Sequence, residues 1–392
     1  MTLDSYFAVT APGLEPFAVQ ELHALGLLPG AFTDSDSSLE CSTSINSPQS
    51  AGGVTFKGDL SALYRANLHL RTASRLLARL GNFFSASTFP ELQKRASRLP
   101  WERFLKPGQP VSLRVTCHKS KLYHSDAVAR AVAAGLAERM GRPSPIQAAD
   151  EESSDLPQLV VVRLVEDKCT VSVDSSGVLL HKRGYRQAVA KAPLRETLAA
   201  ALLMASGWDK ASPLLDPFCG SGTIPIEAAL MAGGIPPGIN RRFAFMDWPN
   251  YDEKLWLSIK DIQSLSFVQP FSILASDRDA GAIEMSRANA ERAGVAETIE
   301  FKCQAVSAID PPSGKGWVVT NPPYGLRVSG GKDLRNLYAQ FGNVLRQHCP
   351  GWDLSVLCSD AALLGQMHLE LDTSLVLYNG GISVRLGRGS VR

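Results

Sequence analysis

Residues 214–229 read LLDPFCGSGTIPIEAA, and this stretch decides the fold class. Two leucines that end in Asp216 have the character of a short buried strand, and the turn GSG at 220–222 precedes a helix that begins near Thr223. Glycines let a backbone approach a ligand closely, and a helix N-terminus offers free N–H groups. Because open α/β sheets bind ligands at the edge where their strands end, we expect a ligand site here.

The same stretch does not fit the common nucleotide-binding loops. A dinucleotide fingerprint needs GxGxxG, but Pro225 occupies the place of the third glycine, and the phosphate loop GxxxxGK[ST] is absent from the sequence. An acidic residue before the turn suits a ligand with a cationic head better than a pyrophosphate. The sequence DPFCGSGT resembles the S-adenosylmethionine-binding loop of class I methyltransferases.

From about residue 190, apolar strand-like runs alternate with helical stretches. This alternation predicts βαβ crossovers and a parallel sheet, and the runs 374–378 and 382–386 around Asn379-Gly380-Gly381 predict a closing hairpin. A parallel sheet that ends in a hairpin is typical of class I methyltransferases and unusual for dinucleotide dehydrogenases. The other expected elements are strands at 213–215, 272–275, 299–303, 317–320 and 354–357, and helices at 194–206, 223–232, 279–293 and 333–347.

Two further strand ends are expected to complete a cofactor site. Asp277 ends the second strand, where a carboxylate can accept both hydroxyls of a ribose, and Asp279 is expected to cap the next helix. Gln304 follows the third strand, where its amide or the backbone would contact an adenine. The residues expected to bind the cofactor are Glu196, Thr197, Asp216, Phe218, Gly220, Ser221, Gly222, Thr223, Asp277, Arg278, Gln304, Ala305 and Asn321.

The fourth strand ends in TNPPY, which resembles the signature of amino-methyltransferases. Methylating an exocyclic amine is difficult because its lone pair is delocalised into the ring. The Asn321 side-chain oxygen and the Pro322 carbonyl can each accept an N–H from that amine, and Pro322 and Pro323 hold these acceptors rigidly. Tyr324 offers a ring on which a base can stack. We expect Asn321, Pro322, Pro323 and Tyr324 to be catalytic, whereas a cytosine-C5 methyltransferase would need a cysteine here.

The first 175 residues show a different pattern, typical of small α+β modules. Stretches rich in Ser, Asp, Gly or Pro at 31–53 and 141–157 indicate loops. The expected elements are helices at 59–80 and 125–140, the latter with Ser125 as N-cap and Gly141 as stop, a strand at 111–116, and a hairpin of 159–164 and 169–173 around 166–168.

Composition limits the partners and the compartment. The net charge is only +2, so any nucleic-acid surface must be local. The sequence lacks an apolar run of about 18 residues, which predicts no membrane span, and its N-terminus lacks the pattern of a signal peptide. Seven scattered cysteines without a CxxC pair favour a cytoplasmic protein without disulfides, and together with the dispersed histidines they predict no metal site.

Two local basic clusters are candidate RNA contacts. The first precedes the methyltransferase-like half, and the second surrounds a strand-to-helix loop of the first half. Each cluster fits an ordinary solvated surface as well, and the residues alone leave this alternative open. The candidate residues are His181, Lys182, Arg183 and Arg186, with Tyr185 interleaved, and Arg114, Lys119 and Lys121, with His118 and His124 nearby.

Several stretches together resemble the THUMP-domain RNA guanine-N2 methyltransferases, in particular the RlmL-type enzymes that act on 23S ribosomal RNA. They are GDLSALYRANLHLRTASRLL, LPWERFL, KLYHSDAVARAV, VDSSGVLLHKRGYR, APLRETLAAALL, DPFCGSGTIPIEAAL and TNPPYG. The resemblance implies a ferredoxin-like module at 1–58, a THUMP RNA-binding domain at 59–175, a linker at 176–192, and a Rossmann-like class I methyltransferase domain at 193–392 with sheet order 3-2-1-4-5-7-6. It also implies S-adenosylmethionine as cofactor and N2-methylguanine as product.

The residues leave the target open. The NPPY motif fits adenine N6 or cytosine N4 as well as guanine N2, and THUMP modules commonly engage tRNA, so a tRNA guanine-N2 methyltransferase is the main alternative. A DNA amino-methyltransferase would leave residues 1–175 unexplained. An RNA-binding assembly factor would have a degraded loop at 216–223, and this loop is intact. The chain ends after one methyltransferase domain, so we expect a single activity, and we favour a monomer.

Overall fold

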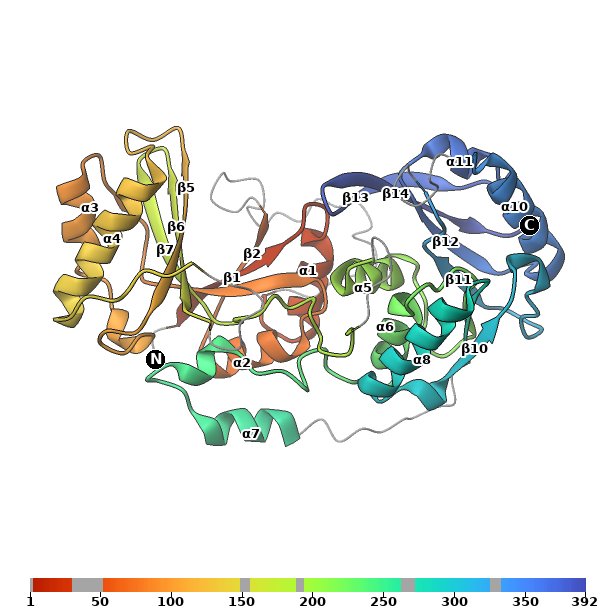
Figure 1. Ribbon diagram of the computed structural model, residues 1–392, viewed down its shortest axis with the longest axis horizontal. Coiled ribbons are helices and arrows are strands. Elements are labelled where there is room, and N and C mark those ends of the chain that lie inside the picture. The colour runs from red at the N-terminus through yellow and green to blue at the C-terminus, as the bar shows by residue number, and fades with distance from the viewer. Residues whose placement is uncertain (1–2, 30–51, 149–155, 188–193, 262–271, 325–332) are drawn as a thin grey trace. The chain divides into compact units, whose positions relative to one another are not determined.

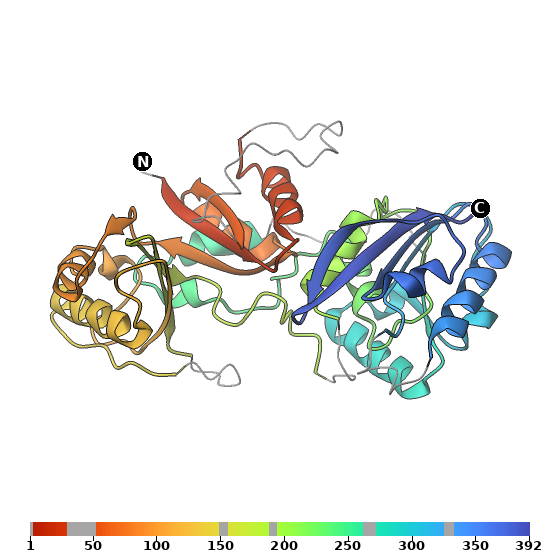
Figure 2. The ribbon, with the colours of Figure 1, turned by 90° about the horizontal axis from the view of Figure 1, so that it is seen from above.

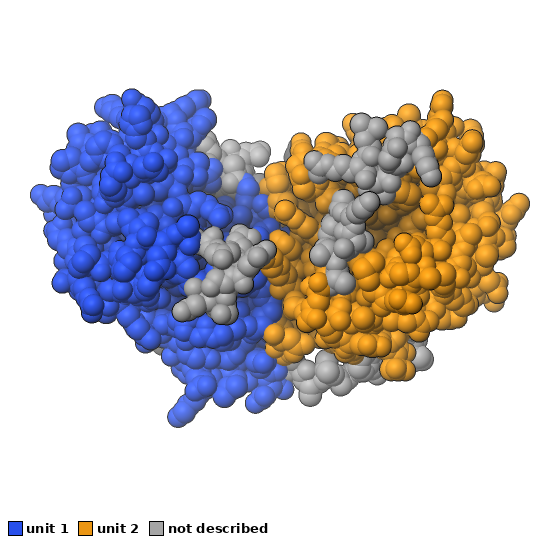
Figure 3. Space-filling model, in the orientation of Figure 1, with its two compact units in different colours: residues 1–10, 18–180, 241–262 blue, residues 11–17, 181–240, 263–392 orange. Residues whose placement is uncertain are grey.

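The computed structural model describes residues 3–29, 52–148, 156–187, 194–261, 272–324 and 333–392. The chain divides into two compact units (Figure 3). Unit 1 comprises residues 1–10, 18–180 and 241–262, and unit 2 comprises residues 11–17, 181–240 and 263–392. The predicted loops at 31–53 and 141–157 and the predicted linker at 176–192 lie partly outside the described residues.

Unit 2 is built on a seven-stranded sheet. Its strands are β8 (Leu214–Asp216), β9 (Ile273–Asp277), β10 (Ile299–Cys303), β11 (Trp317–Thr320), β12 (Asp353–Cys358), β13 (Asp372–Asn379) and β14 (Ile382–Ser390). They lie in the order β10-β9-β8-β11-β12-β14-β13, parallel except for β14, which runs antiparallel to β12 and β13. This arrangement confirms the predicted order 3-2-1-4-5-7-6 and the closing hairpin, whose turn has left-handed φ values of 58° at Gly380 and 86° at Gly381.

Helices cover both faces of this sheet, as crossover connections between parallel strands require (Figure 1). They are α5 (Glu196–Ala205), α6 (Thr223–Ala232), α8 (Ala280–Ala293), α10 (Arg335–His348) and α11 (Ala361–Gly365), with short 3₁₀ turns at Ala296–Thr298 and Val306–Ala308. One core contains α5, α6 and α8, with Leu198, Ile226 and Ile283, and the other contains α10 and α11, with Phe341 and Leu364. Each predicted strand and helix of this half is present.

Unit 1 contains a second sheet, in which strands from the first 80 residues continue into strands from the following segment (Figure 2). Its strands are β1 (Asp4–Thr10), β2 (Gly53–Gly58), β3 (Ala73–Arg79), β4 (Phe84–Ser85), β5 (Val111–His118), β6 (Gln158–Val165) and β7 (Lys168–Asp174). The helices of this unit are α1 (Glu15–Ala24, which starts in unit 2), α2 (Leu60–His69), α3 (Phe89–Ala96) and α4 (Ser125–Met140), with a 3₁₀ turn at Trp101–Arg103. The order is β2-β1-β3-β7-β6-β5, with β4 paired to β7. This sheet with its helices is the expected α+β half of the chain.

Residues 241–262 pack into unit 1, although they lie between α6 and β9 in the chain. This segment contains a 3₁₀ turn (Ala244–Asp247) and α7 (Glu253–Asp261). Phe245 stacks on Tyr64 with a centroid distance of 4.5 Å, and Trp256 meets Tyr64 edge-on at 5.9 Å. These aromatic contacts attach residues 241–262, which lie in the methyltransferase half of the sequence, to the core of unit 1. The domain boundaries at 58, 175 and 192 stay a prediction.

Two expectations for the first half are wrong. The helical spacing predicted over 59–80 continues only to His69, because Ala73–Arg79 forms β3, which pairs with both β1 and β7. The burial gained between two neighbouring strands outweighs the helical pattern of this segment. Ser125 is the first helical residue and not the N-cap, a position taken by His124 without a side-chain hydrogen bond. The predicted stop at Gly141, with φ of 69°, and the hairpin of β6 and β7 are confirmed.

Candidate active site

The turn after β8 presents an open backbone at the carboxyl edge of the sheet. Gly220 and Gly222 have φ of 52° and 82°, in the left-handed region that glycine tolerates best. A Cβ at Gly220 would meet no atom within 4 Å, whereas one at Gly222 would lie 3.1 Å from Cβ of Ser286. Gly220 therefore leaves room for a ligand, and Gly222 lets α6 start directly behind it.

Side chains from β9 and α8 anchor this turn. Gly220 donates its N–H to Oδ2 of Asp277 at 3.1 Å, and its carbonyl accepts a hydrogen bond from Oγ of Ser286 at 2.6 Å. Nδ2 of Asn289 donates to the carbonyl of Ser221 at 3.0 Å. The turn is thus held in a fixed conformation from the side of the protein, which is the preorganisation that a cofactor loop needs.

Asp277 keeps hydrogen-bonding capacity for a ligand. Its two oxygens accept from the N–H groups of Gly220 and of Asp279, the latter at 3.0 Å, and a carboxylate offers about four acceptor positions. The side chain is half-buried at the strand end, as a contact to ribose hydroxyls requires. Asp279 caps α8 by accepting from the N–H of Gly281 at 2.9 Å, which confirms its predicted role.

Asp216 connects the cofactor turn to the tip of β11. Its Oδ1 accepts from Oγ1 of Thr320 at 2.6 Å and from the N–H of Phe218 at 3.2 Å. The carboxyl group is only 1% exposed, and burial raises its pKa to about 7, with a smaller contribution from Asp277. Asp216 therefore connects the ends of the neighbouring strands β8 and β11 through a buried hydrogen bond.

The residues after β11 carry an unused hydrogen-bond acceptor. Oδ1 of Asn321 is buried and has no partner within the described part of the chain, which is costly unless a ligand donates to it. Tyr338 donates its hydroxyl to the carbonyl of Pro323 at 3.4 Å, and Asn379 donates Nδ2 to the hydroxyl of Tyr324 at 3.2 Å. The Tyr324 ring is half-buried against both cores of unit 2. The NPPY tip is thus held by contacts from α10 and β13.

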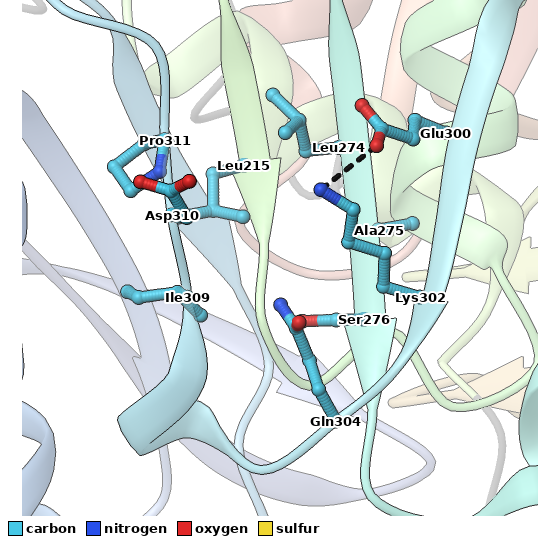
Figure 4. Close-up of a pocket in the computed structure, with 10 residues that line it drawn as sticks. All are labelled: Leu215, Leu274, Ala275, Ser276, Glu300, Lys302, Gln304, Ile309, Asp310 and Pro311. Atoms are coloured by element: carbon cyan, nitrogen blue, oxygen red, sulfur yellow. Dashed lines mark ion pairs between the residues drawn. The ribbon is translucent and has the colours of Figure 1, made fainter.

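Gln304 lies where the sequence predicts, at the end of β10. Its N–H donates to the carbonyl of Asp277 at 2.9 Å, and its side chain lines a small cavity. Figure 4 shows the side chains of β9, β10 and residues 309–311 that line this cavity, with Ser276 among them. Oγ of Ser276 is buried without a partner among the described residues. Gln304 is the single predicted cofactor residue that lines this cavity, so the cavity is not the whole cofactor site.

The other predicted cofactor residues occupy three further places. Phe218 packs edge-on against Phe341 at a centroid distance of 5.2 Å. Arg278 and Ala305 are exposed after β9 and β10, beside the predicted ribose and adenine positions. Thr197 is buried in the first turn of α5, next to Glu196.

The basic cluster at 181–186 is largely turned inward, contrary to the expected RNA contact. Nε of Arg183 lies 3.4 Å from Oε1 of Glu227, and both side chains are almost fully buried. Tyr185 donates its hydroxyl to the same oxygen at 3.2 Å. Arg186 is paired with the buried Glu196 at 3.3 Å. Because burial next to a carboxylate occupies each guanidinium, the positions of Arg183 and Arg186 do not support contact with an RNA backbone.

The remaining predicted RNA residues differ in exposure. Burial lowers the pKa of His181 to about 4, with nearby arginines adding to this, so its imidazole is neutral at physiological pH. Lys182 is exposed. Arg114, Lys119 and Lys121 are exposed along edge strand β5 and the turn after it in unit 1. Arg114 lies within β5, and Lys119 and Lys121 follow its end, so all three remain candidates.

Four residues of the site escaped the sequence analysis. Ser286 and Asn289 on α8, Thr320 on β11 and Tyr338 on α10 hold the two loops in place. The spacing of Ser286 and Asn289, one turn apart on a helix after the cofactor turn, is a signal that was available. The contacts of Thr320 and Tyr338 depend on which strands and helices become neighbours.

Comparisons with known proteins agree with this geometry. Residues 183–386 match the RMKL-like methyltransferase domain, residues 86–174 match the THUMP domain, and residues 42–77 match the RlmL ferredoxin-like domain. The chain belongs to the RMKL-like methyltransferase family. Family members use S-adenosylmethionine, which confirms the predicted cofactor.

Three relatives cover nearly the whole chain. A protein of Synechocystis sp., provisionally named an RNA methyltransferase, is 32% identical over 98% of this chain and 96% of its own. A provisionally named methyltransferase solved with SAH is 28% identical, with a TM-score of 0.83 over 100% of this chain and 99% of its own. A Listeria monocytogenes protein, named as a predicted N6-adenine-specific DNA methylase, is 33% identical, with a TM-score of 0.82 over 99% of this chain and 96% of its own.

The open turn at Gly220, the free capacity of Asp277 and the unpartnered Oδ1 of Asn321 fit this cofactor and an amine substrate. Within the described ranges, no group of three or more His, Cys, Asp or Glu side chains is placed so that it could hold a metal ion. Nor does the described part of the chain contain a helix long and apolar enough to cross a membrane.

Proposed function

We propose that this protein transfers a methyl group from S-adenosylmethionine to the exocyclic N2 of a guanine in RNA, with 23S rRNA as the target. The buried, unpartnered Oδ1 of Asn321 carries this proposal. It lies at the end of β11, joined through Thr320 and Asp216 to the cofactor turn. An acceptor in this place serves an N–H donor on the substrate, whereas O-methylation or C-methylation has no use for it.

Asn321 and Pro322 act on the amine. S-adenosylmethionine supplies an electrophilic methyl group when it is bound. Oδ1 of Asn321 and the carbonyl of Pro322 accept hydrogen bonds from the two N–H groups of the exocyclic amine, which orients its lone pair and offsets the positive charge that develops on nitrogen. Pro322 and Pro323 restrict the backbone, and Tyr324 stacks on the base.

Asp277 and the turn at 220–223 hold the cofactor. Asp277 would accept from the ribose hydroxyls, the Gln304 amide would contact the adenine, and the free N–H groups in the first turn of α6 would bind the anionic carboxylate. Glu196, Thr197, Phe218, Arg278 and Ala305 complete this set as proposed. Arg114, Lys119 and Lys121 are proposed to contact RNA phosphates.

RNA and guanine are supported by different observations. The THUMP match and the name of the Synechocystis relative favour RNA. The RlmL ferredoxin-like match agrees with the resemblance to RlmL-type enzymes, and that resemblance implies guanine N2 in ribosomal RNA. The name of the Listeria monocytogenes relative favours adenine N6, which the NPPY tip would serve equally, so adenine N6 is the second candidate. A tRNA target is the alternative for guanine.

Labelled S-adenosylmethionine distinguishes these targets. The purified protein is incubated separately with protein-free 23S rRNA, with tRNA and with duplex DNA, and the products are digested to nucleosides and identified by mass. We expect label in 23S rRNA as N2-methylguanosine. Label in N6-methyladenine, or label confined to tRNA or DNA, contradicts the proposal in its base or its polymer.

A further inference from the structure

Arg186 lies behind the cofactor turn and reaches three groups at once. Its Nη2 donates to Oγ1 of Thr223 at 2.8 Å and to the carbonyl of Leu194 at 2.7 Å. Its Nε lies 3.3 Å from Oε1 of Glu196. One guanidinium therefore links the start of α6, the start of α5 and the residue that shortly precedes α5.

Thr223 is the position where this contact meets the cofactor site. It is the first residue of α6, directly after Gly222, and it is 5% exposed. Because Arg186 has no acceptor, Oγ1 of Thr223 must accept in this hydrogen bond, and the threonine proton is left for another acceptor. The hydroxyl of Thr223 is thus held as a donor at the N-terminus of α6, where an anionic ligand group is favoured.

A second ion pair supports the same helix one turn further on. Arg183 pairs with Glu227 at 3.4 Å, and Tyr185 donates to the same carboxylate at 3.2 Å. Arg292 donates Nε to the carbonyl of Tyr185 at 2.7 Å. The buried Arg183 and the largely buried Arg186 each lie beside a buried carboxylate, Glu227 and Glu196, so both guanidinium groups point into the protein.

We propose that Arg186 is a positioning residue for S-adenosylmethionine, acting through Thr223. It holds the Thr223 hydroxyl and the first turn of α6 in the orientation that receives the carboxylate of the cofactor. The cationic segment at 183–186 therefore supports cofactor binding and does not contact RNA. This inference goes beyond the proposed function, because it holds for any methyl acceptor, and its test measures cofactor binding without RNA.

Two variants test it. Arg186→Lys keeps the charge but loses the planar fork, and Thr223→Val removes the hydroxyl while leaving the ion pair with Glu196. Each variant should raise the calorimetric Kd for S-adenosylmethionine by about tenfold or more. The affinity for protein-free ribosomal RNA and its dependence on salt should remain those of the native protein.

The control is Arg385→Ala in the same unit, which removes an exposed arginine whose Nη1 donates to the carbonyl of Thr373 at 3.3 Å. It should change neither affinity. Melting temperatures are recorded for all three variants, because a purely structural role lowers the melting temperature without changing the cofactor Kd measured well below it. An unchanged cofactor Kd in Thr223→Val overturns the proposal even where Arg186→Lys fails to fold. So does a weaker RNA affinity of Arg186→Lys with a salt slope reduced by about one.

Discussion

Asp216→Asn should make this protein more stable than the native chain at pH 8. The native carboxyl group is 1% exposed, and burial raises its pKa from 3.8 to about 7, with Asp277 adding to the rise while Thr320 and Phe218 oppose it. At pH 8 the native protein must therefore bury a carboxylate that water would solvate better. Asparagine has the same shape, stays neutral, and its carbonyl oxygen can accept the same hydrogen bonds from Thr320 and Phe218.

The size of the effect follows from the difference in proton binding between the folded and unfolded chains. Near pH 4 and below, Asp216 is increasingly protonated in both states and contributes little. Between the unfolded pKa and the folded pKa only the folded chain holds the proton, so stability falls as pH rises, and above about pH 7 the loss is complete. At about 1.36 kcal/mol per pKa unit, the free energy of unfolding lost by the native chain is at most about 4 kcal/mol.

Urea unfolding of both chains at low and high pH measures this difference. We expect Asp216→Asn to match the native protein near pH 4 and to exceed it by up to about 4 kcal/mol at pH 8. The control Asp372→Asn has the opposite sign, because Ser374 and Arg388 lower the pKa of this exposed carboxyl group to about 2, and its substitution should lower stability at pH 8. A less stable Asp216→Asn at pH 8, or one with the native pH dependence, refutes the reasoning.

Three other substitutions probe the loops of the site. Asn321→Ala should slow methyl transfer by about 100-fold or more in single-turnover assays while leaving the cofactor Kd nearly unchanged, since we propose that its Oδ1 accepts from the substrate amine. Lost cofactor binding with native turnover would contradict this. Gly222→Ala should lower the free energy of unfolding by about 1–3 kcal/mol, because φ is 82° and the new Cβ lies 3.1 Å from Ser286; an unchanged urea midpoint would speak against it. Thr320→Val should shift the pH at which cofactor affinity changes to a higher value, because it removes the hydrogen bond that lowers the pKa of Asp216. A variant with the same dependence of affinity on pH as the native protein would reject that link.

Local chemistry explains why much of the site was predictable. The turn at 220–222 needs glycine for its left-handed backbone, and both φ values follow from neighbours in the sequence. The helix cap at Asp279 is a contact over two residues. The closing hairpin depends on Asn379-Gly380-Gly381 alone. Each of these features is decided within a few residues, so a sequence motif is sufficient to predict it.

Other features depended on partners far away in the chain. Ala73–Arg79 has helical spacing, but β1 and β7 on either side make it a strand. The charges at 181–186 were a candidate RNA contact, yet Glu227, 44 residues from Arg183, places Arg183 in an internal ion pair. Residues 241–262 follow a methyltransferase helix in the chain, yet they belong to unit 1, where their aromatic side chains pack around Tyr64.

The sequence by itself determined the class of chemistry: a cofactor turn, an acidic strand end and the NPPY tip, each specified by its own residues and by the order of strands and helices around them. Only the tertiary structure decided how these parts are held, through Thr320 to Asp216, Ser286 to Gly220 and Arg186 to Thr223. The physical reason is burial. The sequence alone does not show whether a charged or polar side chain lies in water or in a core. Its role depends on which distant group forms hydrogen bonds or an ion pair with it once water is excluded.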